Sequence, residues 1–318
     1  MGALKNIVAA TGLLAAAGIG ETVYFYNRTM KRGNAKTERT TKMSGTDWAK
    51  YFPLMEERKK FVMVQPHRDV YLTSFDGLKL HATYFPAIDG TEQAEKIVIC
   101  FHGYTGEGLS NHVAIADYFL KQGYAMLLPD ARAHGESEGE YIGFGCLDRQ
   151  DALSWIRWTI RECGEKVKIM LHGTSMGGAT VLMASGLELP ANVKGIVSDC
   201  GFTSPKEVFT HVLNHMYHLP AFPAIQGADL LNKRLAGYGM DECNARREVQ
   251  KAKVPILFIH GSADTFVPCS MCHEIYDSCK SSKRKLIIEG AAHAESYYKD
   301  MDAYEKALTE FSEEIMSQ

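Results

Sequence analysis

Apolar runs of strand length alternate with segments of helical character along most of this chain, and this alternation restricts its fold more than any other feature. The runs cover residues 70–75, 78–85, 96–103, 124–130, 167–173, 195–200, 255–261 and 285–290. Candidate helices lie at about 111–122, 146–163, 177–188, 269–280 and 299–316. The last six runs are continuously hydrophobic, as expected for parallel strands buried on both faces. The sequence therefore predicts an α/β fold, in which helices cover both faces of a mostly parallel, twisted sheet.

Two segments should depart from this simple alternation. Asp76-Gly77 separates the first two runs, and such a pair is a strong signal for an antiparallel hairpin. Residues 203–252 lie between two later strands and are too numerous for a structureless loop. We therefore expect a small helical cap, inserted at about 203–252 over the sheet.

The beginning of the chain differs in character from the rest. Residues 6–27 read NIVAATGLLAAAGIGETVYFYN, in which Glu21 is the only charged side chain. This length is borderline for a transmembrane helix. The aromatic run at 24–26, followed by Arg28, Lys31 and Arg32, is typical of a membrane interface. A cleaved signal peptide and a helix lying on the membrane surface are the alternatives.

Basic residues predict how such an anchor is oriented. Only Lys5 precedes the apolar segment, whereas six lysines and arginines follow it between residues 28 and 42. The positive-inside rule then keeps the rest of the chain on the cytoplasmic side of the cell membrane. We expect an N-terminal anchor over 1–32, a polar linker over 33–50 and one α/β domain over 51–318.

Composition removes several other classes of protein. The 318 residues carry a net charge of −3 and no basic stripe with interleaved aromatic residues, so no nucleic-acid partner is expected. Eight cysteines in a chain of this length do not indicate a disulfide framework, which is typical of small secreted domains. The segment Cys269-Ser-Met-Cys272-His273 imitates a redox motif, but no second cysteine pair accompanies it.

A serine framed by glycines follows one of the buried runs. In LHGTSMGG (171–178), Ser175 comes directly after the predicted strand and just before a predicted helix. Ligands of parallel sheets bind at the carboxyl ends of the strands. Gly173 and Gly177 permit a sharp strand–turn–helix connection that pushes the serine Oγ into the cleft. This context favours a nucleophile over a plain tight turn.

A serine nucleophile needs a base and an orienting carboxylate, which should follow it in the order Ser, Asp, His. Asp264 lies just past the strand that begins at residue 255, and His293 lies just past the last strand. Both are therefore expected at the same edge of the sheet as Ser175. Asp199 also ends a strand and is the alternative acid.

Two other sets of residues are less suited to this role. His273 follows Asp264 but belongs to a predicted helix. Asp130, His134 and Ser137 lie within eight residues in a single loop, whereas catalytic residues usually come from different strands. We expect that loop to shape the cleft.

The oxyanion of an acyl-transfer intermediate needs two N–H donors. The amide of Met176 lies at a predicted helix N-terminus, where it can donate to an oxyanion. The second donor should come from the loop after the strand 96–101, and the amide of Tyr104 is the best candidate. The alternative is that Gly103 merely ends the strand in a turn.

Five motifs occur together in this order: HGYTG, DARAHGES, HGTSMGG, HGSADTFVP and GAAHAES. In this respect residues 66–316 resemble the α/β-hydrolase superfamily. They look closest to bacterial membrane-anchored members near the serine-aminopeptidase, monoglyceride-lipase and cinnamoyl-esterase branch. The resemblance implies a Ser175, Asp264, His293 triad with Tyr104 and Met176 as oxyanion donors. One departure concerns the loop with Arg132 and His134, where Ala133 stands in place of the usual glycine.

Aromatic and methionine residues in and beside the predicted cap suggest an apolar acyl or aromatic group in the substrate. They are Phe202, Phe209, Met216, Tyr217 and Phe222. His211, His215 and His218 recur at a spacing that zinc ligands can use. Because apolar residues form an opposite face and no acidic or cysteine partner is near, we expect the polar side of a cap helix and no metal.

These residues predict a serine hydrolase that cleaves small carboxylic esters without a metal or organic cofactor. A thioesterase, lysophospholipase or monoacylglycerol lipase acting on membrane-derived lipids is the alternative among enzymes. Peptidase activity is disfavoured because the cap lacks an evident carboxylate cluster for an ammonium group. A catalytically silent binding protein on the same fold is the alternative outside enzymes.

Overall fold

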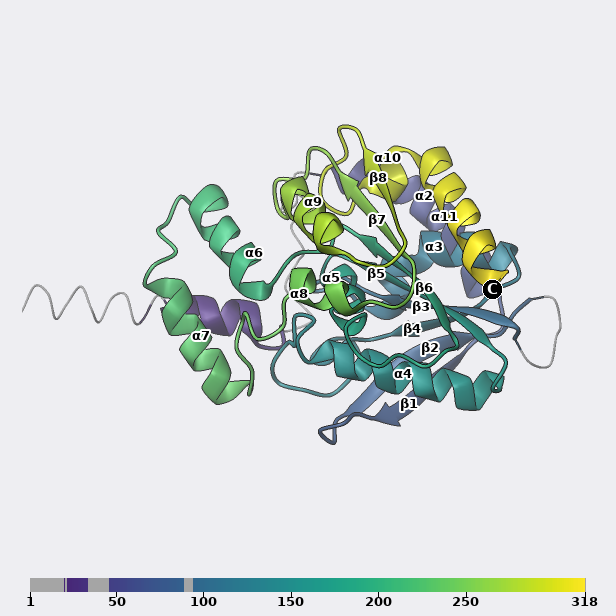
Figure 1. The fold of residues 1–318 in the computed structure, drawn as a ribbon, viewed down its shortest axis with the longest axis horizontal. Coiled ribbons are helices and arrows are strands. Elements are labelled where there is room, and N and C mark those ends of the chain that lie inside the picture. Colours follow the sequence, from purple (N-terminus) through teal and green to yellow (C-terminus); the bar gives the residue numbers. More distant parts are fainter. Residues whose placement is uncertain (1–19, 21, 34–45, 89–93, 318) are drawn as a thin grey trace, which may run out of the picture.

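A single eight-stranded sheet forms the centre of the protein (Figure 1). The computed structural model describes residues 20, 22–33, 46–88 and 94–317. The strand order is β1-β2-β4-β3-β5-β6-β7-β8, with β2 antiparallel to both of its neighbours and all other neighbours parallel. The strands are β1 (Arg68–Thr73), β2 (Lys79–Phe85), β3 (Lys96–Phe101), β4 (Ala125–Pro129), β5 (Lys168–Thr174), β6 (Val193–Asp199), β7 (Ile256–Gly261) and β8 (Lys283–Ile288). The predicted mostly parallel sheet with an antiparallel start is confirmed.

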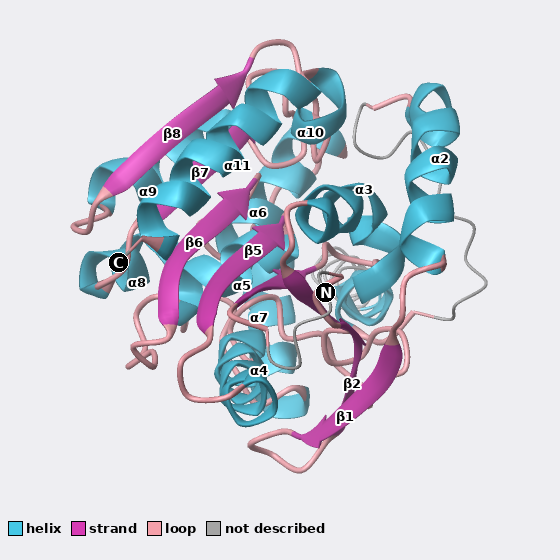
Figure 2. Ribbon diagram, turned by 90° about the vertical axis from the view of Figure 1, so that its right-hand side faces the viewer, coloured by secondary structure: helices cyan, strands magenta, loops and turns pink. Residues whose placement is uncertain are grey.

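Helices cover both faces of this sheet (Figure 2). One face packs against α2 (Phe52–Met63), α3 (Gly108–Lys121), α10 (Ser296–Lys299) and α11 (Met301–Met316). The other face packs against α4 (Asp148–Cys163), α5 (Met176–Ala184) and α9 (Cys269–Ser278). The sequence did not indicate α2 or the turn η1 (Trp48–Tyr51) before it. Val62 is the one buried side chain of α2, so its sequence lacks an apolar stripe.

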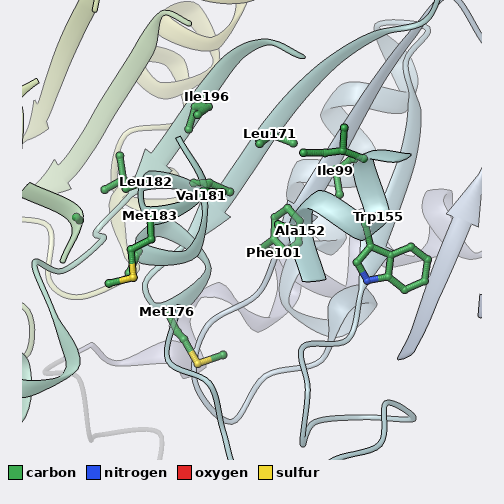
Figure 3. Close-up of a cluster of buried hydrophobic side chains, with 14 of the residues drawn as sticks. Ile99, Phe101, Ala152, Trp155, Leu171, Met176, Val181, Leu182, Met183 and Ile196 are labelled. Carbon is green, nitrogen blue, oxygen red and sulfur yellow. The ribbon is translucent and has the colours of Figure 1, made fainter. Parts of the chain in front are cut away.

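Alternate residues of the central strands serve the two faces. On β3, Ile97 and Ile99 belong to the cluster beneath α4 and α5, whereas Val98 and Cys100 belong to the cluster beneath α3 and α11. Figure 3 shows the first cluster, where Ile99 of β3 and Trp155 of α4 lie on the same side of the sheet. Burial on both faces explains why these strands read as continuous apolar runs.

The chain between β6 and β7 folds into short helices, the two longest of which extend past the carboxyl ends of the strands (Figure 1). They are α6 (Pro205–His211), the π-helical turn η2 (Val212–Met216), α7 (Ala224–Leu235), α8 (Ala245–Glu248) and the 3₁₀ turn η3 (Val249–Lys251). We call residues 203–252 the cap. Ser204 begins α6 by accepting a hydrogen bond from the Glu207 amide.

The three cap histidines do not share one helical face. The rings of His211 and His215 lie 4.6 Å apart, but helical structure ends at Met216 and His218 has a φ of 54°. The π-helical turn interrupts the 3.6-residue period on which the expectation of a common face depended.

Residues 22–30 form a helix that packs against the body of the protein, and we call it the N-terminal helix. Tyr26 is only 2% exposed, and its hydroxyl donates to Oδ1 of Asn232 at 3.2 Å. The carbonyl of Met30 accepts from the Ile142 amide at 2.8 Å. Just beyond the helix, the Arg32 guanidinium donates to the carbonyl oxygens of Gly135 and Ser137.

These contacts differ from the role expected for Tyr26 and Arg32 at a membrane interface. Both side chains contact protein instead. An amphipathic aromatic or basic residue suits a protein interface as well as a lipid interface, so the sequence pattern alone is compatible with either. Most of the predicted transmembrane segment lies outside the described residues. Among the helices that are described, none has the length and apolarity needed to cross a membrane.

Candidate active site

Ser175 occupies a sharp turn between β5 and α5. Its φ of 56° and ψ of −112° are strained for a residue with a side chain. Gly177 is required here, because a Cβ at this position would collide with the carbonyl of Phe101 on β3. A Cβ at Gly173 would likewise collide with the backbone of Gly177. The two glycines therefore allow the close packing that the turn demands, as the sequence predicted.

The loops after β7 and β8 bring Asp264 and His293 to this serine. Nε2 of His293 lies 2.8 Å from Oγ of Ser175, and Nδ1 lies 2.7 Å from Oδ2 of Asp264. A carboxylate only accepts hydrogen bonds, so Nδ1–H is the donor to Asp264 and Nε2 is free to accept from the serine hydroxyl. All three residues are buried, with Ser175 only 6% exposed. The structure thus brings together the three residues that were predicted to act in concert.

Asp264 is held in its charged form by several donors. Its Oδ1 accepts the amides of Phe266 and Val267, both at 2.9 Å. Nε2 of His260, beneath it on β7, lies 3.2 Å from Oδ2. Burial alone would raise the pKa of this carboxyl, but the electrostatic interaction with His293 and the hydrogen bonds from both histidines keep it well below its usual range.

Asp199, the alternative acid, has a different environment. Its Oδ2 accepts from the Tyr304 hydroxyl at 3.1 Å, and complete burial raises its pKa to about 6. Its backbone carbonyl accepts the amide of Ser175 at 2.8 Å. Asp199 therefore supports the turn that carries the serine, whereas Asp264 contacts the histidine.

The loop after β3 lies beside the serine. A Cβ built on Gly103 would stand 3.5 Å from Cβ of Ser175, so this backbone passes directly over the nucleophile. Nε2 of His134 accepts the amide of Thr105 at 3.3 Å, and burial lowers the pKa of His134. The amide of Thr105 is thus engaged. The neighbouring amide of Tyr104 and that of Met176, the first residue of α5, stay the predicted oxyanion donors.

Two supporting residues were not identified from the sequence. His260 precedes Asp264 by four positions, and its place at the end of a buried strand was the available signal. Thr46 lies within the predicted linker, yet it is buried and its hydroxyl donates to the carbonyl of His293 at 3.4 Å. Its polar, aperiodic surroundings in the sequence gave no sign of this contact.

The predicted pocket residues have unequal exposure. Phe202 is buried, and Phe209 is half-buried with its ring 5.0 Å from that of Phe144. Met216, Tyr217 and Phe222 are exposed, and Phe222 reaches 73%. Their role toward a substrate is still a prediction.

The remaining residues considered as catalytic or metal-binding candidates either lie away from Ser175 or have another role. His273 is exposed on α9, where Nζ of Lys285 contacts its Nδ1 at 2.9 Å. Among the described residues, Cys200, Asp264 and His293 are the one group whose atoms are close enough for a shared metal. Asp264 and His293 already bind each other in that group, and the cap histidines are not part of it.

Comparisons with known proteins agree with this architecture. Residues 96–220 match the family model described as alpha/beta hydrolase fold. The uncharacterized protein YqkD of Bacillus subtilis is 27% identical over 308 residues, which cover 97% of each chain. The uncharacterized protein YfhR of Escherichia coli is 25% identical over 247 residues, covering 76% of this chain and 79% of YfhR.

Two solved structures are similar to that of this chain. The Pyrococcus furiosus esterase Pf2001 has a TM-score of 0.64 and 22% identity, covering 81% of this chain and 94% of the esterase. Est1E from Butyrivibrio proteoclasticus, solved with ferulic acid bound, has a TM-score of 0.60 and 20% identity, covering 78% of this chain and 100% of Est1E. At these identities the likeness concerns the fold. The chain therefore has the α/β-hydrolase fold, with a serine at the turn where that fold carries its nucleophile.

Proposed function

We propose that the protein is a serine hydrolase that cleaves carboxylic esters through an acyl-enzyme on Ser175. The observation that carries this proposal is the pair of distances at His293, 2.8 Å to Ser175 and 2.7 Å to Asp264. A histidine bonded on both sides in this way can take the serine proton and stabilise the resulting charge on the imidazole. One structural neighbour, the Pyrococcus furiosus protein Pf2001, is an esterase, which is consistent with this chemistry.

The proposed reaction has two steps. His293 accepts the proton of Ser175 as Oγ attacks the ester carbonyl, and the same proton then goes to the leaving alcohol. Water attacks the acyl-enzyme with His293 again as the base, and the serine recovers its proton. Backbone amides of Tyr104 and Met176 would hold the oxyanion in both steps.

The proposed substrate is a small ester with an apolar acyl or aromatic part. Phe209, which is half-buried in the cap, and Phe202, which is buried just before the cap, support this class of substrate. We also propose that the N-terminal segment, expected as an anchor over 1–32, holds the chain in the cell membrane through the residues before the N-terminal helix, with the α/β domain on the cytoplasmic side. The apolar composition of 6–27 and the basic residues after it support that arrangement.

Labelling of the full chain with a fluorophosphonate probe tests the proposal. We expect stoichiometric labelling of the wild type and none of Ser175→Ala or His293→Ala. Nitrophenyl esters of increasing acyl length would then define the substrate preference. A folded wild type that takes up no label and hydrolyses none of these esters would favour a catalytically silent binding protein.

A further inference from the structure

Large apolar side chains on the surface of this protein are concentrated at one end. Of the fourteen that are exposed among the described residues, six lie in the cap and two, Val23 and Tyr24, lie in the N-terminal helix. The six in the cap are Met216, Tyr217, Leu219, Phe222, Leu230 and Leu235. The remaining six are spread over 52–88. We call the eight residues of the cap and the N-terminal helix the apolar end face.

The two parts of this face belong to one packed unit. The rings of Phe25 and Tyr217 lie 6.0 Å apart, and the Tyr26 hydroxyl binds Asn232 of α7. A Cβ added at Gly227 would approach the Thr22 side chain to 3.0 Å. Figure 1 shows the N-terminal helix, in purple, beside α6 and α7 at the end of the molecule toward which the carboxyl ends of the strands point.

The outer side of α7 has the pattern of a helix at a lipid interface. Leu230 is 69% exposed, and exposed Lys233 and Arg234 follow it at the i+3 and i+4 positions on the same side. Asn232 and Ile225 are buried against the protein. An exposed leucine bordered by basic side chains suits the boundary between acyl chains and anionic head groups.

The sequence that leads into the N-terminal helix identifies the occupant of this face. Residues 6–20 contain no charged side chain, so they favour the same apolar medium as the exposed leucines. We propose that the apolar end face rests on a lipid bilayer, with Leu230 and its neighbours among the head groups. The inference goes beyond the proposed hydrolysis and does not depend on it. In the proposed orientation, the end of the protein that carries Ser175 faces the membrane.

Tryptophan scanning of the full chain in vesicles tests this proposal. Leu230→Trp and Leu219→Trp each add one indole to the apolar end face. Val64→Trp adds one at a 77% exposed site directly after α2, a helix that lies away from α6 and α7 in Figure 1. Vesicles of phosphatidylcholine and phosphatidylglycerol would carry bromine near the head groups. The native tryptophans are common to all variants, so differences in quenching report the added indole.

We expect the added emission of Leu230→Trp and Leu219→Trp to be largely lost in brominated vesicles, and that of Val64→Trp to be unchanged. Equal melting temperatures of the three variants would exclude misfolding. If the indoles at 219 and 230 respond like the one at 64, the proposal is wrong. Protection from aqueous acrylamide without quenching by bromine would also overturn it, because a protein partner would then cover the face. Since the readout is lipid contact, failure here leaves the hydrolase proposal untouched.

Discussion

Nε2 of His293 lies 2.8 Å from Oγ of Ser175, although 118 positions separate the two residues in the chain. The contact exists because β5 and β8 are parallel strands of one sheet and the loops after them open at the same edge. Everything proposed about catalysis depends on this contact.

The two candidate acids can be separated by isosteric substitution. In Asp264→Asn the amide oxygen stays with the amides of Phe266 and Val267, so the NH₂ group faces Nδ1 of His293 and favours the wrong tautomer of the imidazole. We therefore expect kcat to fall by roughly 10⁴-fold. Asp199→Asn keeps an oxygen for the Tyr304 hydroxyl, and its kcat should stay close to that of the wild type. Steady-state hydrolysis of a nitrophenyl ester distinguishes them. The reverse ranking would make Asp199 the acid.

Asp199 should impose a pH dependence on stability. Burial raises its folded pKa to about 6, above the usual value of 3.8, so the folded state favours the neutral acid. The stability from this group is present below pH 3.8 and is lost as the pH rises through 6. Asp199→Asn lacks this loss. Relative to the wild type it should gain up to about 3 kcal/mol in unfolding free energy between pH 4 and pH 8.

Denaturant unfolding of both proteins at several pH values measures that difference. Asp199→Asn also changes hydrogen bonding by an amount that does not vary with pH, so the informative quantity is the change in the difference. A constant offset across the range would contradict the prediction.

Ala133 stands in a backbone conformation that favours glycine, with a φ of 61°. Its amide donates to the carbonyl of Glu138 at 2.9 Å, which fixes the loop in this shape. Ala133→Gly relieves the steric cost but makes the unfolded chain more flexible. We expect a net gain of about 0.5 kcal/mol in unfolding free energy, measured by urea denaturation. A loss of stability would show that the buried methyl group matters more than the strain.

His134 is expected to position the loop that carries Tyr104. Its Nε2 accepts the Thr105 amide and its Nδ1 donates to the Arg132 carbonyl at 3.0 Å. Loss of one such bond is worth about 1 kcal/mol. His134→Ala should therefore lower kcat about fivefold with little change in KM, because the bond positions the loop in the transition state. His134→Gln retains an acceptor and should recover part of the activity. If the role of His134 were purely structural, His134→Ala would lower the melting temperature without lowering kcat selectively over KM.

Arg32 should tie the N-terminal helix to the loop beside the site. Arg32→Met removes the donors to the carbonyls of Gly135 and Ser137 while keeping an unbranched stem. Unfolding free energy should fall by about 1 to 2 kcal/mol. Lys31→Met is the matched control, because the exposed ammonium of Lys31 contacts Glu140 and the ring of Tyr141 rather than the carbonyls of Gly135 and Ser137. Thermal melting of the two variants decides the matter, and equal melting temperatures would refute a specific role for Arg32.

Much of the fold and the core of the site follow from local patterns in the sequence. Continuous apolar runs indicated strands buried on both faces, and the glycines around Ser175 indicated a turn that no larger residue permits at those positions. Chain order then indicated Asp264 and His293, since parallel strands place their carboxyl ends at one edge of the sheet. These inferences succeed because burial and steric exclusion act on each short segment in the same way wherever it lies.

Only the tertiary structure decided the features that depend on contacts between distant segments of the chain. Asp199 ends β6 and Asp264 follows the end of β7, and only the packing of β7 beside β8 brings Asp264 to His293. Tyr26 has the same amphipathic character for lipid and for Asn232, so composition could not choose its partner. Ala133 adopts its unusual φ because its amide reaches Glu138, and Thr46 is buried because its segment meets the His293 loop. In each case the deciding energy comes from a contact between distant parts of the chain, which no local pattern encodes.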